Sequence, residues 1–296
     1  VEWRVINAAE YGYQQRRRRT FIFAYRNDTK YAEDVADAIQ YINKSKLEEN
    51  RQSMNRVLVH DGFFAETFPV YDVDSKQMKI VELPEGIGEL SEEFEFNFEN
   101  TGVMKDGVVY TTKTMPKYEG NVTTLGDIME KEEVDKKYFI PKEKLYYTNS
   151  NITHSDETHG KLPKEERQTW QYIKGAKKLA RKSSGGHEYI FSEGAIPMVD
   201  DEDKPARTML TSEGGFNRST HIVKDKKTGN IRLLTAGETE RIQGFPTDHT
   251  KYCLVNGETV EMPLNKRRFM MGNALVVNLI EDMEKTLDKI FEREYR

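Results

Sequence analysis

The sequence contains one cysteine, Cys253, among its 296 residues. A single cysteine excludes an internal disulfide and any metal site built from several cysteines, and it fits a reducing cytosol. Two histidines, His154 and His159, have no third ligand at a suitable spacing. We therefore expect a cytoplasmic protein without a metal site.

Long apolar runs are also missing. No run approaches the roughly 18 residues that a transmembrane helix requires, and no signal peptide opens the sequence. We therefore expect no association with a membrane. The sequence begins at Val1, inside a predicted strand, and we expect it to be a piece of a longer protein.

An overall excess of basic residues is absent as well, because the net charge is −5. This value by itself argues against binding to nucleic acid, but residues 161–187 contain eight lysines and arginines and only two acidic residues. Local basic patches, rather than the total charge, govern binding to phosphates. Within residues 167–181, Trp170 and Tyr172 are interleaved with basic residues. This mixture fits either an amphipathic helix with its aromatic residues in the core or a face that contacts phosphates.

Near the N-terminus, two β-rich runs at residues 3–9 and 20–25 flank the basic segment Q-Q-R-R-R-R at residues 14–19. The second run, T-F-I-F-A-Y, is almost continuously apolar, which predicts a strand buried on both faces of its sheet. Arginines held at the edge of that sheet can grip a phosphate or a carbonyl group through a bidentate contact. The alternative is an ordinary solvated charge run.

Residues 231–246 predict a short strand followed by a helix. Thr235 can cap this helix, Glu238 three residues later can complete a capping box, and a glycine and a proline can end it. Glu238 and Arg241 would then lie on one short, rigid element. Such an element suits holding a domain in place better than catalysis.

Two glycine-containing segments are candidates for close contact with a ligand. Residues 207–223 predict a strand that runs into Gly214 and Gly215, where the backbone can approach a ligand; a plain β-hairpin is the alternative. Gly272 and Asn273 form a predicted turn at the N-terminus of a helix, where a ligand can also approach closely.

Three of these segments occur in the order of the last motifs of DNA (cytosine-5) methyltransferases. N-A-A-E-Y-G-Y-Q-Q-R-R-R-R-T-F-I at residues 7–22 resembles the Q-x-R-x-R motif of that family. L-T-A-G-E-T-E-R-I-Q-G-F-P at residues 234–246 resembles its next block, and M-G-N-A-L-V-V-N at residues 271–278 resembles its closing G-N-S-V block. The segment R-T-M-L-T-S-E-G-G at residues 207–215 falls where the family has its target recognition domain. The sequence thus resembles the C-terminal portion of such an enzyme over essentially its whole length.

The resemblance implies an α/β plus α+β fold. In this fold the edge of a Rossmann-like, S-adenosylmethionine-dependent methyltransferase domain is joined to a smaller, mostly β target recognition domain. The implied parts are the last strands of the catalytic domain with the Q-x-R-x-R motif at residues 1–30, a linking or inserted segment at 31–115, the target recognition domain with its brace helix at 116–265, and a C-terminal helix that returns to the catalytic domain at 266–296.

The implied reaction transfers a methyl group from S-adenosylmethionine to a cytosine flipped out of duplex DNA, as in restriction-modification. The family attacks this base with the cysteine of a Pro-Cys motif and holds the cofactor with a glycine-rich loop. Neither motif occurs here, and Cys253 stands in K-Y-C-L. We therefore expect an incomplete enzyme that needs an N-terminal catalytic portion or a separate catalytic subunit. The alternative is a sequence-specific DNA-binding module that never catalyses a reaction.

The resemblance also implies roles for individual residues. The catalytic residues would be the motif residues Gln15, Arg17 and Arg19, with the arginines beside the flipped base. The cofactor contacts would be Gly272, Asn273 and Ala274, where Ala274 replaces the usual serine. The DNA contacts would be Arg207, Thr208, Gly214, Gly215, Arg218 and Ser219. The structural brace would be Thr235, Glu238 and Arg241.

Overall fold

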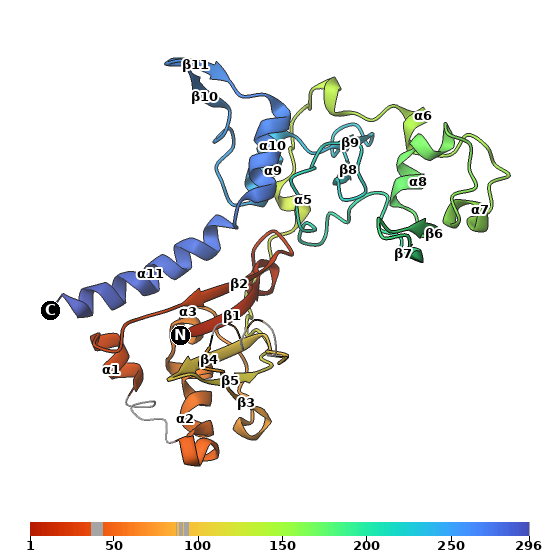
Figure 1. The fold of residues 1–296 in the computed structure, drawn as a ribbon. Coiled ribbons are helices and arrows are strands. Elements are labelled where there is room, and N and C mark those ends of the chain that lie inside the picture. Colours follow the sequence, from red (N-terminus) through yellow and green to blue (C-terminus); the bar gives the residue numbers. More distant parts are fainter. Residues whose placement is uncertain (37–43, 87, 89–90, 92–94, 296) are drawn as a thin grey trace. The chain divides into compact units, whose positions relative to one another are not determined.

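The computed structural model describes residues 1–295 except 37–43, 87, 89–90 and 92–94. The chain divides into two units (Figure 1): unit 1 comprises Val1–Val122 and Val276–Arg296, and unit 2 comprises Thr123–Leu275. Each unit has hydrophobic core residues of its own. None of the described helices is both long enough and apolar enough to cross a membrane.

Unit 1 is built around a five-stranded antiparallel sheet in the order β2-β1-β4-β5-β3. Its strands are β1 Glu2–Asn7, β2 Arg18–Phe23, β3 Lys79–Glu82, β4 Thr101–Lys105 and β5 Val108–Thr112. Its α-helices include α1 Lys30–Ala36, α2 Arg51–Arg56, α3 Phe63–Thr67 and α11 Val277–Glu294. Segments of 3₁₀-helix lie at η1 Ala8–Tyr11, η2 Lys44–Asn50 and η4 Ser75–Gln77, and a π-helical segment lies at η3 Val57–Asp61. The C-terminal helix α11 returns to pack against α1 and α3.

The side chains of β1 alternate between the two faces of this sheet, as the geometry of a strand requires. Glu2 and Arg4 are buried on the core side, whereas Trp3 is half-buried on the other side. The Arg4 guanidinium donates hydrogen bonds to the carbonyl oxygens of Phe64 at 2.8 Å and Phe68 at 2.6 Å. These bonds stabilise a charge that would otherwise be costly to bury.

The prediction that residues 20–25 form a strand buried on both faces is wrong. β2 is the edge strand of the sheet, and half-buried residues alternate with exposed ones along it. Phe21 and Phe23 pack against the core, whereas Ile22 on the opposite face is 70% exposed. In the described part of the chain, the core covers only the Phe21 and Phe23 face of the strand. The apolar composition of the run does not reveal this difference between the two faces.

Glu2 should make the stability of unit 1 depend on pH. Its carboxylate accepts a hydrogen bond from the Tyr31 hydroxyl at 3.0 Å, and burial raises the pKa of Glu2 to about 7. The folded unit therefore holds this proton more tightly than the unfolded chain, in which the pKa is about 4.3. The free energy of unfolding should fall, by on the order of 3 kcal/mol, as the pH rises from about 4.3 to about 7.

Glu2→Gln should remove this part of the pH dependence in urea unfolding followed by Trp3 fluorescence in a Trp170→Phe background. The control is Glu258→Gln, because Glu258 is an exposed residue of unit 2. If Glu2→Gln leaves the slope of stability against pH unchanged, burial of Glu2 does not control it.

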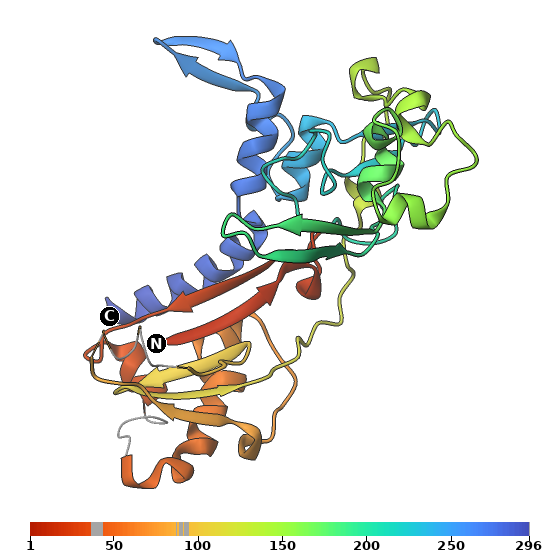
Figure 2. The same ribbon diagram turned by 45° about the vertical axis from the view of Figure 1, so that its right-hand side comes forward.

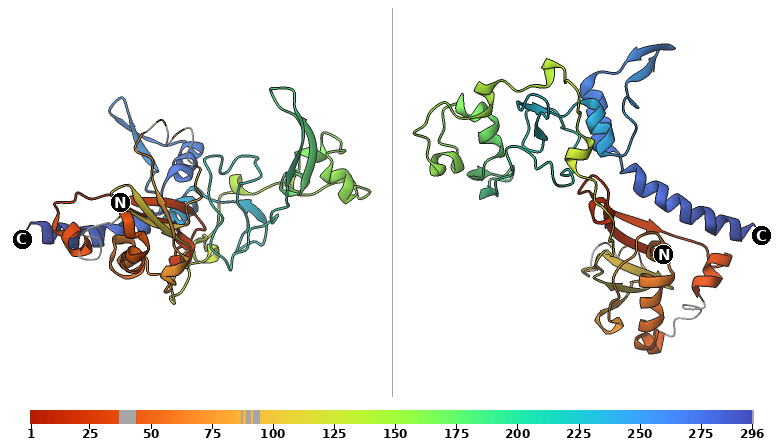
Figure 3. Two further views of the ribbon diagram at one scale, coloured as in Figure 1. Left: turned by 60° about the horizontal axis from the view of Figure 1, so that its bottom comes forward. Right: turned by 180° about the vertical axis from the view of Figure 1, so that it is seen from behind.

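Unit 2, all of whose residues are described, contains three separate two-stranded antiparallel sheets. They pair β6 Lys177–Lys182 with β7 Glu188–Glu193, β8 Ile222–Lys224 with β9 Ile231–Leu233, and β10 Tyr252–Val255 with β11 Glu258–Glu261. Its helices are α5 Leu125–Ile128, α6 Lys142–Leu145, α7 His154–Thr158, α8 Trp170–Lys174, α9 Ala236–Ile242 and α10 Leu264–Asn273, with shorter turns at η5 Lys136–Tyr138 and η6 Glu166–Gln168. The β6–β7 and β10–β11 hairpins are extended ribbons (Figures 2 and 3).

Residues 167–181 do not form one amphipathic helix. α8 ends at Lys174, and β6 begins at Lys177 after Gly175. Trp170 is buried in the core formed with Leu145 and Ile222. One of the interleaved aromatic residues is therefore a core residue, while the basic residues that follow belong to a hairpin.

Candidate functional site

The basic segment at residues 14–19 covers the end of the connection between β1 and β2 and the first two residues of β2, where Arg18 pairs with Asn7. Backbone hydrogen bonds fix it: the Ala8 N–H donates to the Arg17 carbonyl at 3.2 Å, and the Arg17 N–H donates to the Gln15 carbonyl at 3.0 Å. The side chains of Gln15 and Arg17 are buried, whereas Arg18 is exposed. The connection therefore holds one glutamine and one arginine of the motif in defined positions.

Arg17 is a buried cation immediately before strand β2, with only 2% of its surface exposed. Burial, together with the positive charge of nearby Arg19, lowers the pKa of Arg17 to about 10. Arg17 remains positively charged at neutral pH because its pKa lies well above 7. Arg19 is half-buried, and its guanidinium donates to the Arg18 carbonyl at 2.7 Å. This pair of cations favours a partly negative group beside it.

The prediction that the segment before Gly214 is a strand is wrong. Residues 207–213 form a loop, and a buried network of side chains holds it. The Asp200 carboxylate accepts hydrogen bonds from the Arg207 guanidinium at 2.5 and 3.1 Å. The Glu213 carboxylate bonds to the backbone N–H of His221 at 3.0 Å and to its ring at 2.8 Å. Hydrogen bonds made by the Asp200 and Glu213 carboxylates thus hold this loop, and no pairing with a neighbouring strand is needed.

Both arginines predicted to contact DNA are engaged within unit 2. Besides its pair with Asp200, Arg207 donates to the Thr220 carbonyl at 3.2 Å. Arg218 donates to the carbonyl of Gly175 at 3.0 Å and to that of Gly194. These contacts give both arginines a structural role, and their contact with DNA stays a prediction.

The smaller residues of the same loop are closely packed. Gly214 has a φ of +79°, and a Cβ atom there would lie 2.2 Å from the Arg268 guanidinium. The Ser219 hydroxyl donates to the Asn217 side chain at 2.9 Å. Thr208 and Gly215 lie on the same loop, and DNA contacts by the whole group remain untested predictions.

The predicted helix of residues 231–246 is confirmed as α9, including its capping box. The Thr235 hydroxyl accepts a hydrogen bond from the Glu238 N–H at 3.1 Å, and the Glu238 carboxylate accepts one from the Thr235 N–H at 2.7 Å. Gly244, with a φ of +83°, follows the end of the helix. Local sequence determines both ends of this element.

Buried ion pairs connect α9 to its neighbours. Arg232 of β9 has no exposed surface, and it donates two bonds of 2.8 Å to the Glu238 carboxylate and one of 2.9 Å to Asp225. Arg241 pairs with Glu130 at 2.8 Å. These contacts support the bracing role predicted for Thr235, Glu238 and Arg241.

The prediction that Gly272 and Asn273 lie at the N-terminus of a helix is wrong. They are the last two residues of α10, and α11 begins only after Val276. A Cβ atom on Gly272 would lie 2.4 Å from the backbone of Leu210, so the missing side chain permits close packing of α10 on the loop. Asn273 is exposed and Ala274 is half-buried. Of the three predicted cofactor contacts, Gly272 therefore has the protein's own backbone, at Leu210, in the space beside it.

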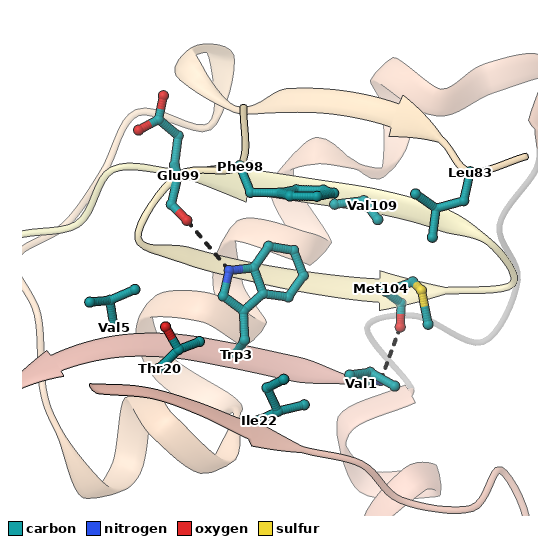
Figure 4. A pocket seen from close by; sticks show the side chains of 10 residues that line it. All are labelled: Val1, Trp3, Val5, Thr20, Ile22, Leu83, Phe98, Glu99, Met104 and Val109. Carbon is teal, nitrogen blue, oxygen red and sulfur yellow. Dashed lines mark hydrogen bonds between the residues drawn. The ribbon is translucent and has the colours of Figure 1, made fainter. Parts of the chain in front are cut away.

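An apolar groove of about 460 Å³ lies on the face of the unit 1 sheet that carries Trp3 and Ile22 (Figure 4). The Trp3 and Phe98 rings meet edge to face with their centroids 5.6 Å apart. The remaining lining residues are Val1, Val5, Thr20, Leu83, Glu99, Met104 and Val109. Sequence analysis did not single out this groove. The available signal was the presence of apolar residues on both faces of β1 and β2, since a solvated face is usually polar.

Across the described parts of the chain, no three His, Cys, Asp or Glu side chains come together as a possible metal site. His154 and His159 lie at the start and just after the end of α7.

Comparisons with known proteins identify relatives. The family described as C-5 cytosine-specific DNA methylase matches residues 1–289. The type II methyltransferase M.Sau3AI of Staphylococcus aureus is 38% identical over 291 residues, which cover 98% of this chain and 59% of that protein. The chain thus spans 59% of the length of this relative. The solved structure of the Entamoeba histolytica methyltransferase EhMeth is 10% identical with a TM-score of 0.31, covering 72% of this chain and 55% of that chain.

Proposed function

Because the chain belongs to the C-5 cytosine-specific DNA methylase family, we propose that it is the target-recognition and C-terminal part of a DNA cytosine-5 methyltransferase. The enzyme would transfer a methyl group from S-adenosylmethionine to C5 of a cytosine flipped out of duplex DNA. The family match over residues 1–289 carries the assignment to a cytosine-5 methyltransferase. The proposal that the chain is the C-terminal part is supported by its three motif segments, which resemble the last motifs of the family. A role in restriction-modification follows from the similarity to a type II methyltransferase.

Arg17 is the residue that we propose to act on the flipped base. Nucleophilic attack on the ring of cytosine builds negative charge on the ring, including its O2 atom, and a fixed guanidinium beside O2 would stabilise that charge. Arg17 meets the requirements, because its side chain is buried and its backbone, just before β2, is fixed by hydrogen bonds to Ala8 and Gln15. Arg19 adds positive charge near Arg17, and Gln15 would position the segment of residues 14–19.

The nucleophile must come from a part of the enzyme outside this sequence. Cys253 lies on β10, in the sequence K-Y-C-L, and is not preceded by proline. We infer that a catalytic portion of the same enzyme, or a separate subunit, supplies both the Pro-Cys motif and the glycine-rich cofactor loop. The similarity to M.Sau3AI covers 98% of this chain and only 59% of that protein, so the relative contains further residues that match nothing here, which supports this inference.

S-adenosylmethionine would supply the methyl group when it is bound. The residues of this chain fit the cofactor only in part, because Gly272 packs on Leu210 and Ala274 carries no hydroxyl. Asn273 is the exposed polar residue of the closing motif and the one that we propose as a contact. Most of the cofactor site would then belong to the catalytic portion.

We further propose that the catalytic portion docks on β2 and the apolar groove beside it, which makes the unit 1 sheet the edge of a larger, Rossmann-like sheet. β2 has one strand neighbour among the described residues, so its outer edge can pair with another strand. The groove offers Trp3, Ile22 and Phe98 for burial next to that edge.

Ile22→Glu should therefore weaken association with the catalytic portion. Losing the burial of one isoleucine and desolvating a carboxylate should raise the Kd about 10- to 100-fold in a titration calorimetry experiment. The matched control is Leu254→Glu in unit 2, because Leu254 is 74% exposed and Ile22 is 70% exposed. Equal effects of the two substitutions would contradict docking at the groove.

Complementation tests the proposed function. The chain is mixed with the polypeptide that carries the Pro-Cys motif, and transfer of label from methyl-labelled S-adenosylmethionine to duplex DNA is followed. We expect transfer only when both are present. DNA binding without any transfer would instead favour the alternative of a non-catalytic, sequence-specific DNA-binding module.

A further inference from the structure

The β6–β7 hairpin is an exposed basic element of unit 2 to which no role has been assigned above. All ten residues from 181 to 190 are exposed. The hairpin carries the basic residues Lys177, Lys178, Arg181 and Lys182, and its two acidic residues are Glu188, opposite Lys182, and Glu193, opposite Lys177. This local excess of positive charge occurs in a chain whose net charge is −5.

The turn of the hairpin has a defined shape. The Ser183 N–H donates to the His187 carbonyl at 2.8 Å, and the Gly186 N–H donates to the Ser183 carbonyl at 3.0 Å. Gly186 has a φ of +85°, which favours glycine at this position. The basic residues before the turn are therefore displayed on an ordered ribbon.

The base of the hairpin is clamped to the rest of unit 2. Arg218 donates to the carbonyl of Gly175, just before β6, and to that of Gly194, just after β7. It also pairs with Glu193 at 3.2 Å. Arg218 thus joins both ends of the ribbon, which keeps its tip projecting from a fixed base (Figure 3).

One face of the hairpin forms a groove of about 440 Å³ with the loop that follows Gly215. The Arg181 guanidinium lies 3.7 Å from the centroid of the Phe191 ring, a cation–π contact that orients it. Phe216 and Tyr172 also line the groove. Lys178 and Lys182 alternate with Arg181 along β6 and so lie on the opposite face of the ribbon.

We propose that the β6–β7 hairpin enters the major groove of the target duplex. This inference rests on the proposed function, which makes DNA the substrate. The major groove of B-DNA admits a two-stranded β-ribbon, and basic side chains on the ribbon match its negative charge. Lys178 and Lys182 contact phosphates, and Arg181, held by Phe191, reads a base edge.

The test compares the full chain with Lys178→Ala/Lys182→Ala in binding to a short fluorescent duplex between about 50 and 200 mM salt. We expect the double variant to bind about tenfold more weakly at the lower salt concentration, and the slope of log K against log salt to become shallower by about two, or one per phosphate contact. The matched control is Lys142→Ala/Lys144→Ala on α6, where both lysines are exposed. Thermal unfolding verifies that all variants are folded.

The outcomes separate the hairpin from the function. The hairpin is not the DNA-binding element if its double variant keeps the affinity and salt slope of the unmodified chain, or if the α6 control changes equally. Methyl transfer in the complementation assay would still support the proposed function in that case. Arg181→Ala should broaden the set of methylated sites in a random-sequence duplex library read by bisulfite sequencing. An unchanged set would overturn base reading by Arg181.

Discussion

Arg17→Ala should lower kcat for methyl transfer about 10²- to 10³-fold in the enzyme assembled from this chain and its catalytic portion, which is the typical cost of removing one preorganised donor from developing charge. The effect should fall on kcat because the charge on the cytosine ring appears during the reaction and not when duplex DNA first binds. The Kd for duplex DNA should therefore change by no more than about fivefold, since many phosphate contacts share that binding energy. Arg17→Lys should be intermediate, because lysine keeps the charge and loses the planar guanidinium.

Arg18→Ala is the matched control for Arg17→Ala. Arg18 is the next residue along the chain, but its side chain is 73% exposed and lies 3.6 Å from Glu10. Single-turnover kinetics and a binding titration on the same duplex should show wild-type-like values for this control. If binding and turnover fall together in Arg17→Ala, or if Arg18→Ala loses as much turnover, Arg17 does not act on the flipped base.

Glu238→Gln should destabilise unit 2 by about 3–5 kcal/mol, the usual cost of removing one partner from a buried ion pair. Arg232 would keep its charge with no exposed surface and with Asp225 as its remaining carboxylate partner. The same substitution weakens the capping box of α9, because a glutamine side chain accepts the Thr235 N–H bond without a negative charge. Urea unfolding followed by Trp170 fluorescence in a Trp3→Phe background reports on unit 2.

The control for this prediction is Glu130→Gln. Glu130 pairs at 2.8 Å with Arg241, which lies on α9 like Glu238. The Glu130 and Arg241 side chains, however, are 33% and 24% exposed. A partly solvated pair of this kind contributes about 0.2–1 kcal/mol. Similar losses for Glu130→Gln and Glu238→Gln would show that burial of the Arg232 pair does not brace the unit.

The sequence predicted those features that depend on neighbouring residues. Thr235 and Glu238 are three positions apart, so their capping box is a local event and was predicted correctly. The strand β1 and the helix α9 also follow from local patterns. The order of motif segments identified the family, which the match over residues 1–289 bears out.

Features that depend on distant residues were not predictable in this way. β2 was predicted as a core strand because its residues are apolar, yet no local pattern reports how many faces of a strand are covered. Arg218 was predicted to face DNA, but it bonds to Gly175 and Gly194, which are 43 and 24 positions away. The sequence of residues 167–181 fits two interpretations for the same reason, since only the fold separates buried Trp170 from the exposed residues of β6.

The most direct measurement is the identity of the methylated nucleoside formed by the complemented enzyme. Duplex DNA is incubated with both parts and S-adenosylmethionine, digested to nucleosides and analysed by mass spectrometry against standards. We predict 5-methylcytosine, formed only when this chain is present and reduced in Arg17→Ala. The formation of N4-methylcytosine or N6-methyladenine, or of 5-methylcytosine by the catalytic portion alone, would contradict the role assigned to this chain.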